Sequence, residues 1–206
     1  MRGPIPLRSR DEIAGAAVAL ADASGLDAVT MRRLAAELGS AGASLYRYVA
    51  SRDELLDLMV DRAMRALAPP PPTGRWQEDV VALGRALLAV HRRHRWLVDV
   101  RQGSTTPGPS AVDLFELGLG AVAPVAAGTA RLMEAVAMLV GVVTLFAQQE
   151  AHAAAFAFPP IDADRWPLLS AAFGAPVPDG GPPAADLFDR VVVGVVAGVL
   201  GEAADR

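Results

Sequence analysis

The chain has 206 residues, 52% of them hydrophobic, so it can bury the core of one large domain or of two modest ones. It contains no cysteine, which excludes disulfides, thiolate nucleophiles and cysteine-ligated zinc and fits a reducing cytoplasm. The net charge of −4 argues against a general polyanion binder, but residues 1–52 carry seven arginines against five acids, and this excess favours a nucleic-acid-facing end.

The first residues carry arginines and prolines without the apolar stretch of a secretory signal, so we expect a cytoplasmic protein. Two apolar runs, 135–147 and 191–201, fall short of the ~20 residues that cross a bilayer. We interpret both runs as buried helices and expect no membrane partner. Because no stretch alternates polar and apolar residues as a strand does, the predicted fold class is all-α.

Two copies of the tetrapeptide SRDE, at 9–12 and 51–54, form capping boxes that mark helix starts. The first helix is expected to end before Gly25, and the second to run toward Leu67. Between them, Thr30 is a good N-cap for the segment MRRLAAEL, and Gly39 sits where a helix end favours a left-handed residue. A further short helix at 42–49 completes a helix-turn-helix.

On a helical wheel of residues 42–49, Leu45 and Val49 share one side, whereas Tyr46 and Arg47 project away from it. Arginine, serine and tyrosine are the side chains that commonly contact DNA phosphates, and arginine also reads guanine. The segment is therefore a candidate recognition helix. The alternative is that Tyr46 and Tyr48 only cover a small three-helix core.

Three stretches, GLDAVTMRRLAAELG at 25–39, SLYRYV at 44–49 and SRDELLDLMVD at 51–61, closely resemble the DNA-binding domain of the TetR family of bacterial transcriptional regulators. The resemblance covers 9–67 and implies binding to double-stranded operator DNA. It implies that Thr30 and Arg52 hold phosphates and that Arg32 reaches a base edge. The recognition helix then offers Ser44, Tyr46, Arg47 and Tyr48, with the two tyrosines at the sugar-phosphate backbone.

Two departures from the family pattern matter. Gly42 and Ala43 are too small to hydrogen-bond bases, so direct readout is expected from Arg32, Ser44 and Arg47. Ser40 stands where the family has an apolar residue under the turn, and it either caps the recognition helix or softens the turn. Arg33, next to Arg32, is expected to be a solvated charge.

A proline-rich connector at 68–75 separates this domain from a helical domain at 76–206. The expected helices of the second domain are 75–93, a short one from Trp96, 110–123, 128–153, 162–173 and 184–204. The segment WQEDVVALGRALLAVHRRHRWL also resembles the family, which implies a domain for effector binding and dimerisation.

The effector pocket is predicted from one face of the 128–153 helix and from neighbouring side chains. The candidate residues are His91, Phe115, Leu119, Met133, Val140, Thr144 and Gln148. Such a face fits a small, mostly apolar ligand, and the alternative is that it forms ordinary core. A metal shared by His91 and His94 is the poorer interpretation, since no carboxylate partner is assigned, and surface histidines among arginines are expected instead.

Gly194, Gly198 and Gly201 lie in a valine-rich helix, where each glycine costs about 1 kcal/mol relative to alanine. Close approach of a second copy would compensate, which predicts a homodimer through a four-helix bundle. The alternative is a helix buried within its own subunit. No catalytic motif stands in a fitting context, and the spacing GLGAVA at 118–123 has no strand before it, so no enzyme and no cofactor is expected.

The sequence therefore predicts a homodimeric repressor that a small molecule releases from its operator. The alternative is a DNA-binding regulator without a small-molecule effector, controlled by a protein partner or acting as an activator.

Overall fold

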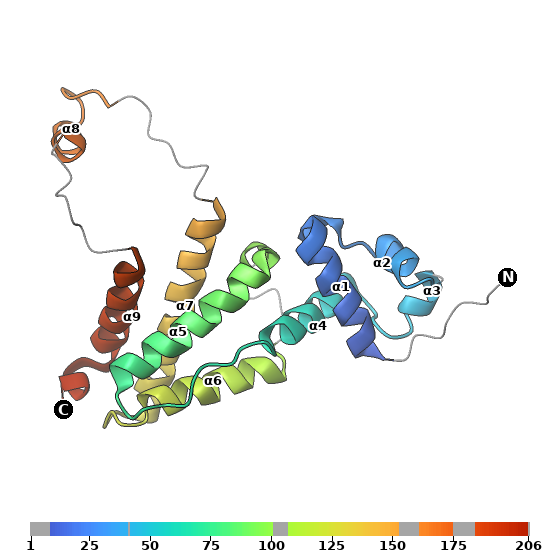
Figure 1. Ribbon diagram of the computed structural model, residues 1–206, viewed down its shortest axis with the longest axis horizontal. Coiled ribbons are helices and arrows are strands. Elements are labelled where there is room, and N and C mark those ends of the chain that lie inside the picture. The colour runs from blue at the N-terminus through green and yellow to red at the C-terminus, as the bar shows by residue number, and fades with distance from the viewer. Residues whose placement is uncertain (1–8, 41, 101–106, 153–160, 175–183, 206) are drawn as a thin grey trace.

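Helices form all the regular structure that the computed structural model describes, which covers residues 9–40, 42–100, 107–152, 161–174 and 184–205. The described residues include no strand, in agreement with the predicted all-α class. The amino-terminal elements lie at one end of the molecule and the longer carboxy-terminal helices at the other (Figure 1).

The amino-terminal helices begin at the predicted caps. They are α1 Arg10–Ser24, the 3-10 turn η1 Leu26–Ala28, α2 Met31–Glu37, α3 Gly42–Leu45 and α4 Arg52–Met64. The Ser9 hydroxyl accepts the Glu12 N–H at 3.1 Å, and the Ser51 hydroxyl accepts the Glu54 N–H at 3.0 Å. The Thr30 hydroxyl accepts the Arg33 N–H at 3.2 Å. Because each cap satisfies a donor that the first helical turn leaves unpaired, short helices start at defined residues.

The carboxy-terminal helices follow the predicted order with some shifted ends. They are α5 Trp76–Arg93, the 3-10 turn η2 Arg95–Asp99, α6 Pro109–Val122, α7 Thr129–His152, α8 Pro167–Gly174, α9 Ala184–Leu200 and the 3-10 turn η4 Gly201–Asp205. The predicted helix at 162–173 starts only at Pro167, and the one at 184–204 ends as an α-helix at Leu200. Gly201 has a φ of 62°, which a left-handed helix end requires.

A buried carboxylate fixes the end of the proline-rich connector. Asp79 in α5 accepts the Thr73 N–H at 2.7 Å, the Thr73 hydroxyl at 2.9 Å and the Gly74 N–H at 3.0 Å. Burial opposes ionisation, but these donors outweigh it and hold the pKa of Asp79 below its usual range. The entry into α5 is therefore ordered by backbone contacts.

The buried side chains form two cores. The larger core lies among α5, α6, α7 and α9, and its fully buried members include Leu83, Leu139 and Leu200. The smaller core lies among α1, α2, α3 and α4, but it also takes in Val90, Trp96 and Leu97 from the end of α5 and from η2. The carboxy-terminal helices thus contribute side chains to the amino-terminal core, and the two parts share a packed junction.

The helix α7 is longer than the apolar run predicted within it. Its 24 residues have a mean hydropathy of 1.8 in the most apolar window, which is long and apolar enough to cross a membrane by length and composition alone. The core helix of a helical bundle passes the same test. In this structure α7 packs against α5, α6 and α9, as a core helix does.

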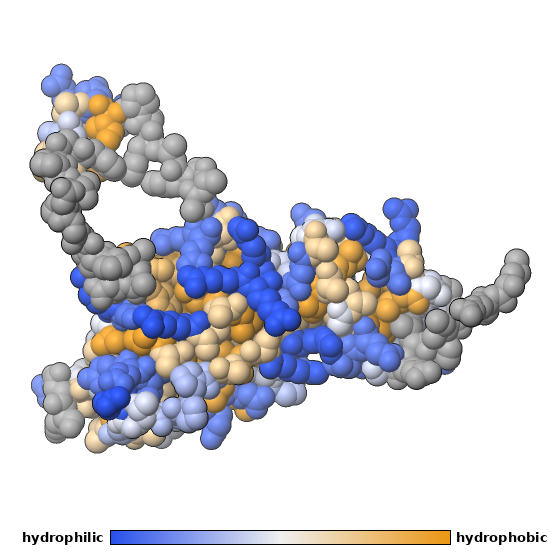
Figure 2. Space-filling view, in the orientation of Figure 1, coloured by the Kyte–Doolittle hydropathy of each residue, from blue (hydrophilic) through white to orange (hydrophobic). Residues whose placement is uncertain are grey.

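The helix α8 lies apart from the other helices in Figure 1, and Figure 2 shows apolar side chains at its surface. Leu168 is 86% exposed.

Candidate DNA interface and effector cavity

The predicted recognition helix is shorter than its sequence pattern indicates. The α-helix α3 covers Gly42–Leu45, and the prediction of a helix over 42–49 is therefore wrong for its second half. There the Leu45 carbonyl accepts both the Tyr48 N–H at 2.9 Å and the Val49 N–H at 3.0 Å, so the chain tightens into a turn. Leu45 and Val49 have no exposed surface, which confirms their role as anchors.

The side chains of this segment divide between surface and core. Tyr46 is 56% exposed and Arg47 is exposed, so Tyr46 does not cover the core. Ser44 and Tyr48 are half-buried, and Tyr48 packs partly against the smaller core. The core-covering interpretation thus holds in part for Tyr48, whose ring contributes packing from the same segment that presents Tyr46 and Arg47 to solvent.

The exposed cations around this segment are Arg32, Arg47 and Arg52. None of the three makes an ion pair with another described residue, so their guanidinium groups are available to phosphate. Arg33 is exposed, as expected for a solvated charge, and it also donates to the Ser24 hydroxyl at 3.1 Å. Arg33 therefore braces α2 against the end of α1.

The turn between α2 and α3 is closed by backbone contacts. Gly39 has a φ of 60°, as predicted for a helix end, and the Ser40 N–H donates to the Ala35 carbonyl at 2.9 Å. Leu34 and Ala35 are buried, so α2 packs on the same core as α3. Residue 41 lies outside the described residues, and capping of α3 by Ser40 stays a prediction.

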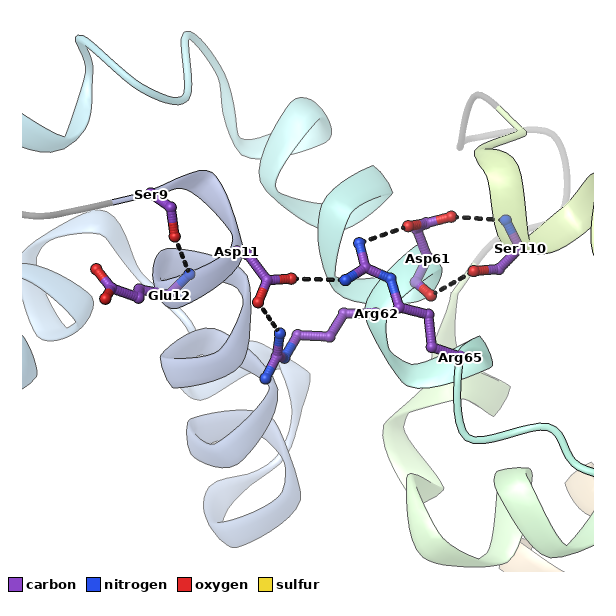
Figure 3. A network of polar contacts seen from close by, with 7 residues as sticks. All are labelled: Ser9, Asp11, Glu12, Asp61, Arg62, Arg65 and Ser110. Atoms are coloured by element: carbon purple, nitrogen blue, oxygen red, sulfur yellow. Dashed lines mark hydrogen bonds and ion pairs between the residues drawn. The ribbon is translucent and has the colours of Figure 1, made fainter.

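A polar network joins α1 and α4 to α6 of the carboxy-terminal part (Figure 3). Asp61 in α4 accepts the Ser110 N–H of α6 at 2.9 Å, and the Ser110 hydroxyl donates to the Asp61 carbonyl at 2.9 Å. Arg65 donates to Asp61 at 3.1 Å and to Asp11 of α1 at 2.7 Å. A side chain at Gly108 would meet the Asp61 carboxylate at 2.6 Å, so glycine is needed there.

The Asp61 carboxylate is held ionised within this network. Burial alone would raise its pKa, but the Ser110 N–H and the Arg65 guanidinium outweigh that effect and hold the pKa below the usual range. At neutral pH the carboxylate therefore accepts hydrogen bonds from α4 and α6 at once.

A second junction joins the end of α1 to η2. The Asp22 carboxylate accepts the His94 Nδ1–H at 2.8 Å and the Trp96 Nε1–H at 2.8 Å. Both donors are buried. The expectation that His91 and His94 lie at the surface is wrong, because the end of α5 packs against α1 and α7 instead of ending in solvent. His94 does have a carboxylate partner, which could not be predicted from the sequence. It is Asp22, more than 70 residues away along the chain.

No group of three or more potential metal ligands occurs among the described residues.

The predicted pocket residues are only partly brought together. Phe115 and Val140 pack against the larger core, Leu119 and Gln148 are half-buried, and Met133 is exposed. The Thr144 hydroxyl donates to the Val140 carbonyl at 2.9 Å, within its own helix. The buried face of α7 consists of other residues, namely Ala135, Val136, Leu139, Val143 and Ala147. Of the seven candidates, only His91 lines the cavity at the junction of α5, η2 and α7.

That cavity, of 260 Å³, lies at the junction of α5, η2 and α7, and we call it the junction cavity. Its lining residues are His91, Arg92, Arg95, Val98, Ala147, Glu150 and Ala151. Arg92 pairs with Glu150 through two hydrogen bonds of 2.8 and 2.6 Å. Burial lowers the pKa of His91, although the Leu87 carbonyl opposes this effect, so the imidazole is neutral at pH 7.

The α7 and α9 helices pack together and leave an apolar outer face. Met138, Leu145 and Leu187 are exposed, and a Cβ atom added at Gly194 or Gly198 would meet no atom within 4 Å. These two glycines therefore face open space in a single subunit. Gly201 has a different local reason to be glycine, namely its positive φ.

Comparison with known families places both halves of the chain. Residues 13–59 match the family model described as bacterial regulatory proteins, tetR family, and residues 68–175 match the tetracyclin repressor-like C-terminal domain. The chain is 42% identical over 153 residues to the HTH-type transcriptional repressor DrrR1 of Streptomyces coeruleorubidus, covering 73% of this chain and 57% of that relative. It is 32% identical over 131 residues to an HTH-type transcriptional regulator of Saccharopolyspora erythraea. The chain spans a little over half the length of these two relatives, 57% and 56%.

Solved structures of similar shape cover nearly the whole chain. The Streptomyces coelicolor TetR family protein ActR in complex with actinorhodin superimposes with a TM-score of 0.79 and 29% identity, over 97% of this chain and 100% of that chain. The same protein in complex with (S)-DNPA gives a TM-score of 0.73 and 28% identity, over 94% of this chain and 98% of that chain.

Proposed function

Because the chain belongs to the TetR family of DNA-binding transcriptional regulators, we propose that it is a homodimeric repressor that a small molecule releases from its operator. The observation that carries this proposal is the exposure of Tyr46 and Arg47 on a segment whose Leu45 and Val49 are fully buried. A rigidly anchored segment with an outward guanidinium and phenol matches the contacts that position a protein on duplex DNA.

The proposed DNA contacts are divided by chemistry. Arg32, Ser44 and Arg47 contact base edges, and Thr30, Tyr46, Tyr48 and Arg52 contact the sugar-phosphate backbone. The proposed domains are 9–67 for DNA binding, 68–75 as connector and 76–206 for effector binding and dimerisation. A regulator of this kind works in the cytoplasm and carries out no catalysis.

The two junctions support control by a ligand. The contacts of Asp61 with Ser110 and of Asp22 with His94 and Trp96 join the DNA-binding helices to α6 and η2. A ligand that prefers another arrangement of α6 or η2 shifts the spacing of the two recognition segments away from adjacent major grooves, about 34 to 36 Å apart. The complexes of ActR with small molecules support the same kind of control here.

The test uses a duplex selected from a random library by the purified protein. Small apolar compounds are titrated against the protein bound to this duplex, and fluorescence anisotropy follows release. We expect at least one compound to release the duplex. If the protein binds the duplex and no compound releases it, the alternative of a regulator without a small-molecule effector is favoured.

Arg47→Ala is expected to weaken binding to the selected duplex by about 1 to 3 kcal/mol and to relax the preference for one base pair, if Arg47 reads guanine. The measurement is anisotropy on the selected duplex and on single-base variants. Equal losses on all duplexes would assign Arg47 to phosphate instead. Arg33→Ala serves as the matched control, because Arg33 already donates to Ser24.

Gly198→Leu is expected to convert the dimer into a species of half the mass, because a leucine side chain would hold apart the α9 helices of the two copies. Light scattering measures the mass. Gly120→Leu is the control, since a Cβ atom at Gly120 of α6 also meets no atom within 4 Å. An unchanged dimer in Gly198→Leu would locate the interface elsewhere.

A further inference from the structure

His91 offers the junction cavity a hydrogen-bond acceptor to which no described residue donates. His91 is 8% exposed, and its Nδ1–H donates to the Leu87 carbonyl at 3.0 Å. A neutral imidazole with its proton on Nδ1 has a lone pair on Nε2, and no described residue donates to that atom. No buried side-chain nitrogen or oxygen among the described residues lacks a partner, so Nε2 keeps accessible surface, and a ligand hydroxyl in the cavity can donate to it.

The cavity also contains a cation with spare donors. Arg92 donates two hydrogen bonds to the Glu150 carboxylate, so this pair lines the cavity with little net charge. Arg95 has no such carboxylate among the described residues, and it donates to the Ala151 carbonyl over a long 3.5 Å. A guanidinium with free donors binds a carboxylate through two parallel hydrogen bonds.

The remaining lining is small and apolar. Val98, Ala147 and Ala151 have no polar side-chain atoms, and the volume of 260 Å³ suits a compact ligand. A neighbouring cavity of 290 Å³ shares Arg92, Arg95, Val98 and Ala151 with the junction cavity. A longer ligand can therefore extend past Arg95 toward Trp96.

From these features we propose that the junction cavity is the effector site and that its ligand is a small organic anion with an apolar body and a hydroxyl group. The hydroxyl donates to His91 Nε2, the carboxylate accepts from Arg95, and the apolar body lies on Val98, Ala147 and Ala151. The identification of this ligand as the effector rests on the proposed function, whereas its binding does not. This proposed anion differs from the mostly apolar ligand that the sequence predicts.

The segment η2 contacts both the junction cavity and the amino-terminal helix α1. Arg95 and Val98 face the junction cavity, and the residues beside Arg95, His94 and Trp96, donate to Asp22 of α1. Leu97 lies in the smaller core. A bound carboxylate that attracts Arg95 therefore displaces η2, the segment that contacts α1. The ligand thereby stabilises the position of η2 to which it binds most tightly.

Calorimetry on the full chain without DNA tests the binding step, with 3-hydroxybenzoate, 4-hydroxybenzoate, benzoate and phenol as probes. We expect the better hydroxybenzoate to bind about 2- to 10-fold more tightly than benzoate, which lacks the hydroxyl. We expect it to bind about 10- to 100-fold more tightly than phenol, which lacks the carboxylate.

Two variants assign these differences to residues. His91→Leu should abolish the advantage of hydroxybenzoate over benzoate, and Arg95→Gln should abolish its advantage over phenol. Arg93→Gln should keep both advantages, because Arg93 is exposed at the same helix end but does not line the junction cavity. Arg95 is exposed, so Arg95→Gln keeps the test valid even where His91→Leu fails to fold. Probe affinities that are undetectable at millimolar concentration, or equal in wild type and variants, overturn the proposal.

Release from DNA separates this inference from the proposed function. Hydroxybenzoate should release the selected duplex from wild type but not from Arg95→Gln. Release by another compound, equal in wild type and both variants, would leave the repressor standing and overturn the junction cavity as effector site. If the protein binds no duplex, the proposed repressor function is wrong. The calorimetry would still decide whether the cavity binds the anion.

Discussion

Leu45→Ala should lower the free energy of unfolding by about 2 to 5 kcal/mol and abolish binding to the selected duplex. The side chain of Leu45 is fully buried in the smaller core, so its removal leaves a cavity under the segment that presents Tyr46 and Arg47. Val49 and the half-buried Tyr48 also hold this segment to the core, so Leu45 supplies a large share of the anchoring but not all of it. Urea unfolding followed by circular dichroism measures the stability, and anisotropy measures the binding.

Tyr46→Ala is the matched control for Leu45→Ala. Tyr46 is the next residue and is largely exposed, so its removal should leave stability within about 0.5 kcal/mol while weakening DNA binding. A Leu45→Ala protein that keeps both its stability and its DNA affinity would contradict the anchoring role of Leu45.

Asp22→Ala should destabilise the protein by at least about 2 kcal/mol, because it leaves two buried donors, His94 Nδ1–H and Trp96 Nε1–H, without their acceptor. Each such donor costs about 1 to 3 kcal/mol when it loses its partner. Urea unfolding again gives the number. Near-ultraviolet circular dichroism should also change, because the environment of Trp96 depends on Asp22.

Asp22→Asn and Asp27→Ala are the controls for Asp22→Ala. Asparagine keeps one acceptor oxygen, so Asp22→Asn should cost less than Asp22→Ala. Asp27 is an exposed acid in the adjacent η1, and Asp27→Ala should be nearly neutral. Equal stabilities of Asp22→Ala and wild type would mean that solvent replaces the carboxylate and that η2 is not fixed through α1.

Local signals in the sequence predicted the parts of the fold that local physics decides. Ser9, Thr30 and Ser51 cap their helices because a hydroxyl and the nearest unpaired N–H lie within three residues of each other. The burial of Leu45 and Val49 followed from their shared helical face. The length of α3 did not follow, because Leu45 and Val49 stay buried on one side even though the chain after Leu45 is a turn.

The junction residues could not be predicted because their contacts join distant parts of the chain. Asp22 meets His94 and Trp96 across more than 70 residues, and no local pattern marks such a pair. For His91 the sequence contains two conflicting patterns. Leu83 and Leu87 precede it at intervals of four, which predicts a buried face, whereas the flanking arginines favoured a surface position.

The face of α7 predicted to line the pocket is rotated from the face that the structure buries. The predicted face contains Met133, Val140 and Thr144, but the face buried in the larger core contains Val136, Leu139 and Val143. Because α7 is apolar over most of its surface, its sequence period does not select one face. Contacts with α5, α6 and α9 decide the orientation instead.

The central claim is that the exposed residues around α3 bind duplex DNA, with Arg52 at a phosphate. The most direct test is the salt dependence of binding to the selected duplex, for wild type and for Arg47→Ala/Arg52→Gln. Wild-type affinity should fall steeply as salt rises, and the logarithmic slope should become shallower by about 1 for each lost phosphate contact. A wild-type affinity that does not change with salt, or an identical slope in the double variant, would contradict the claim.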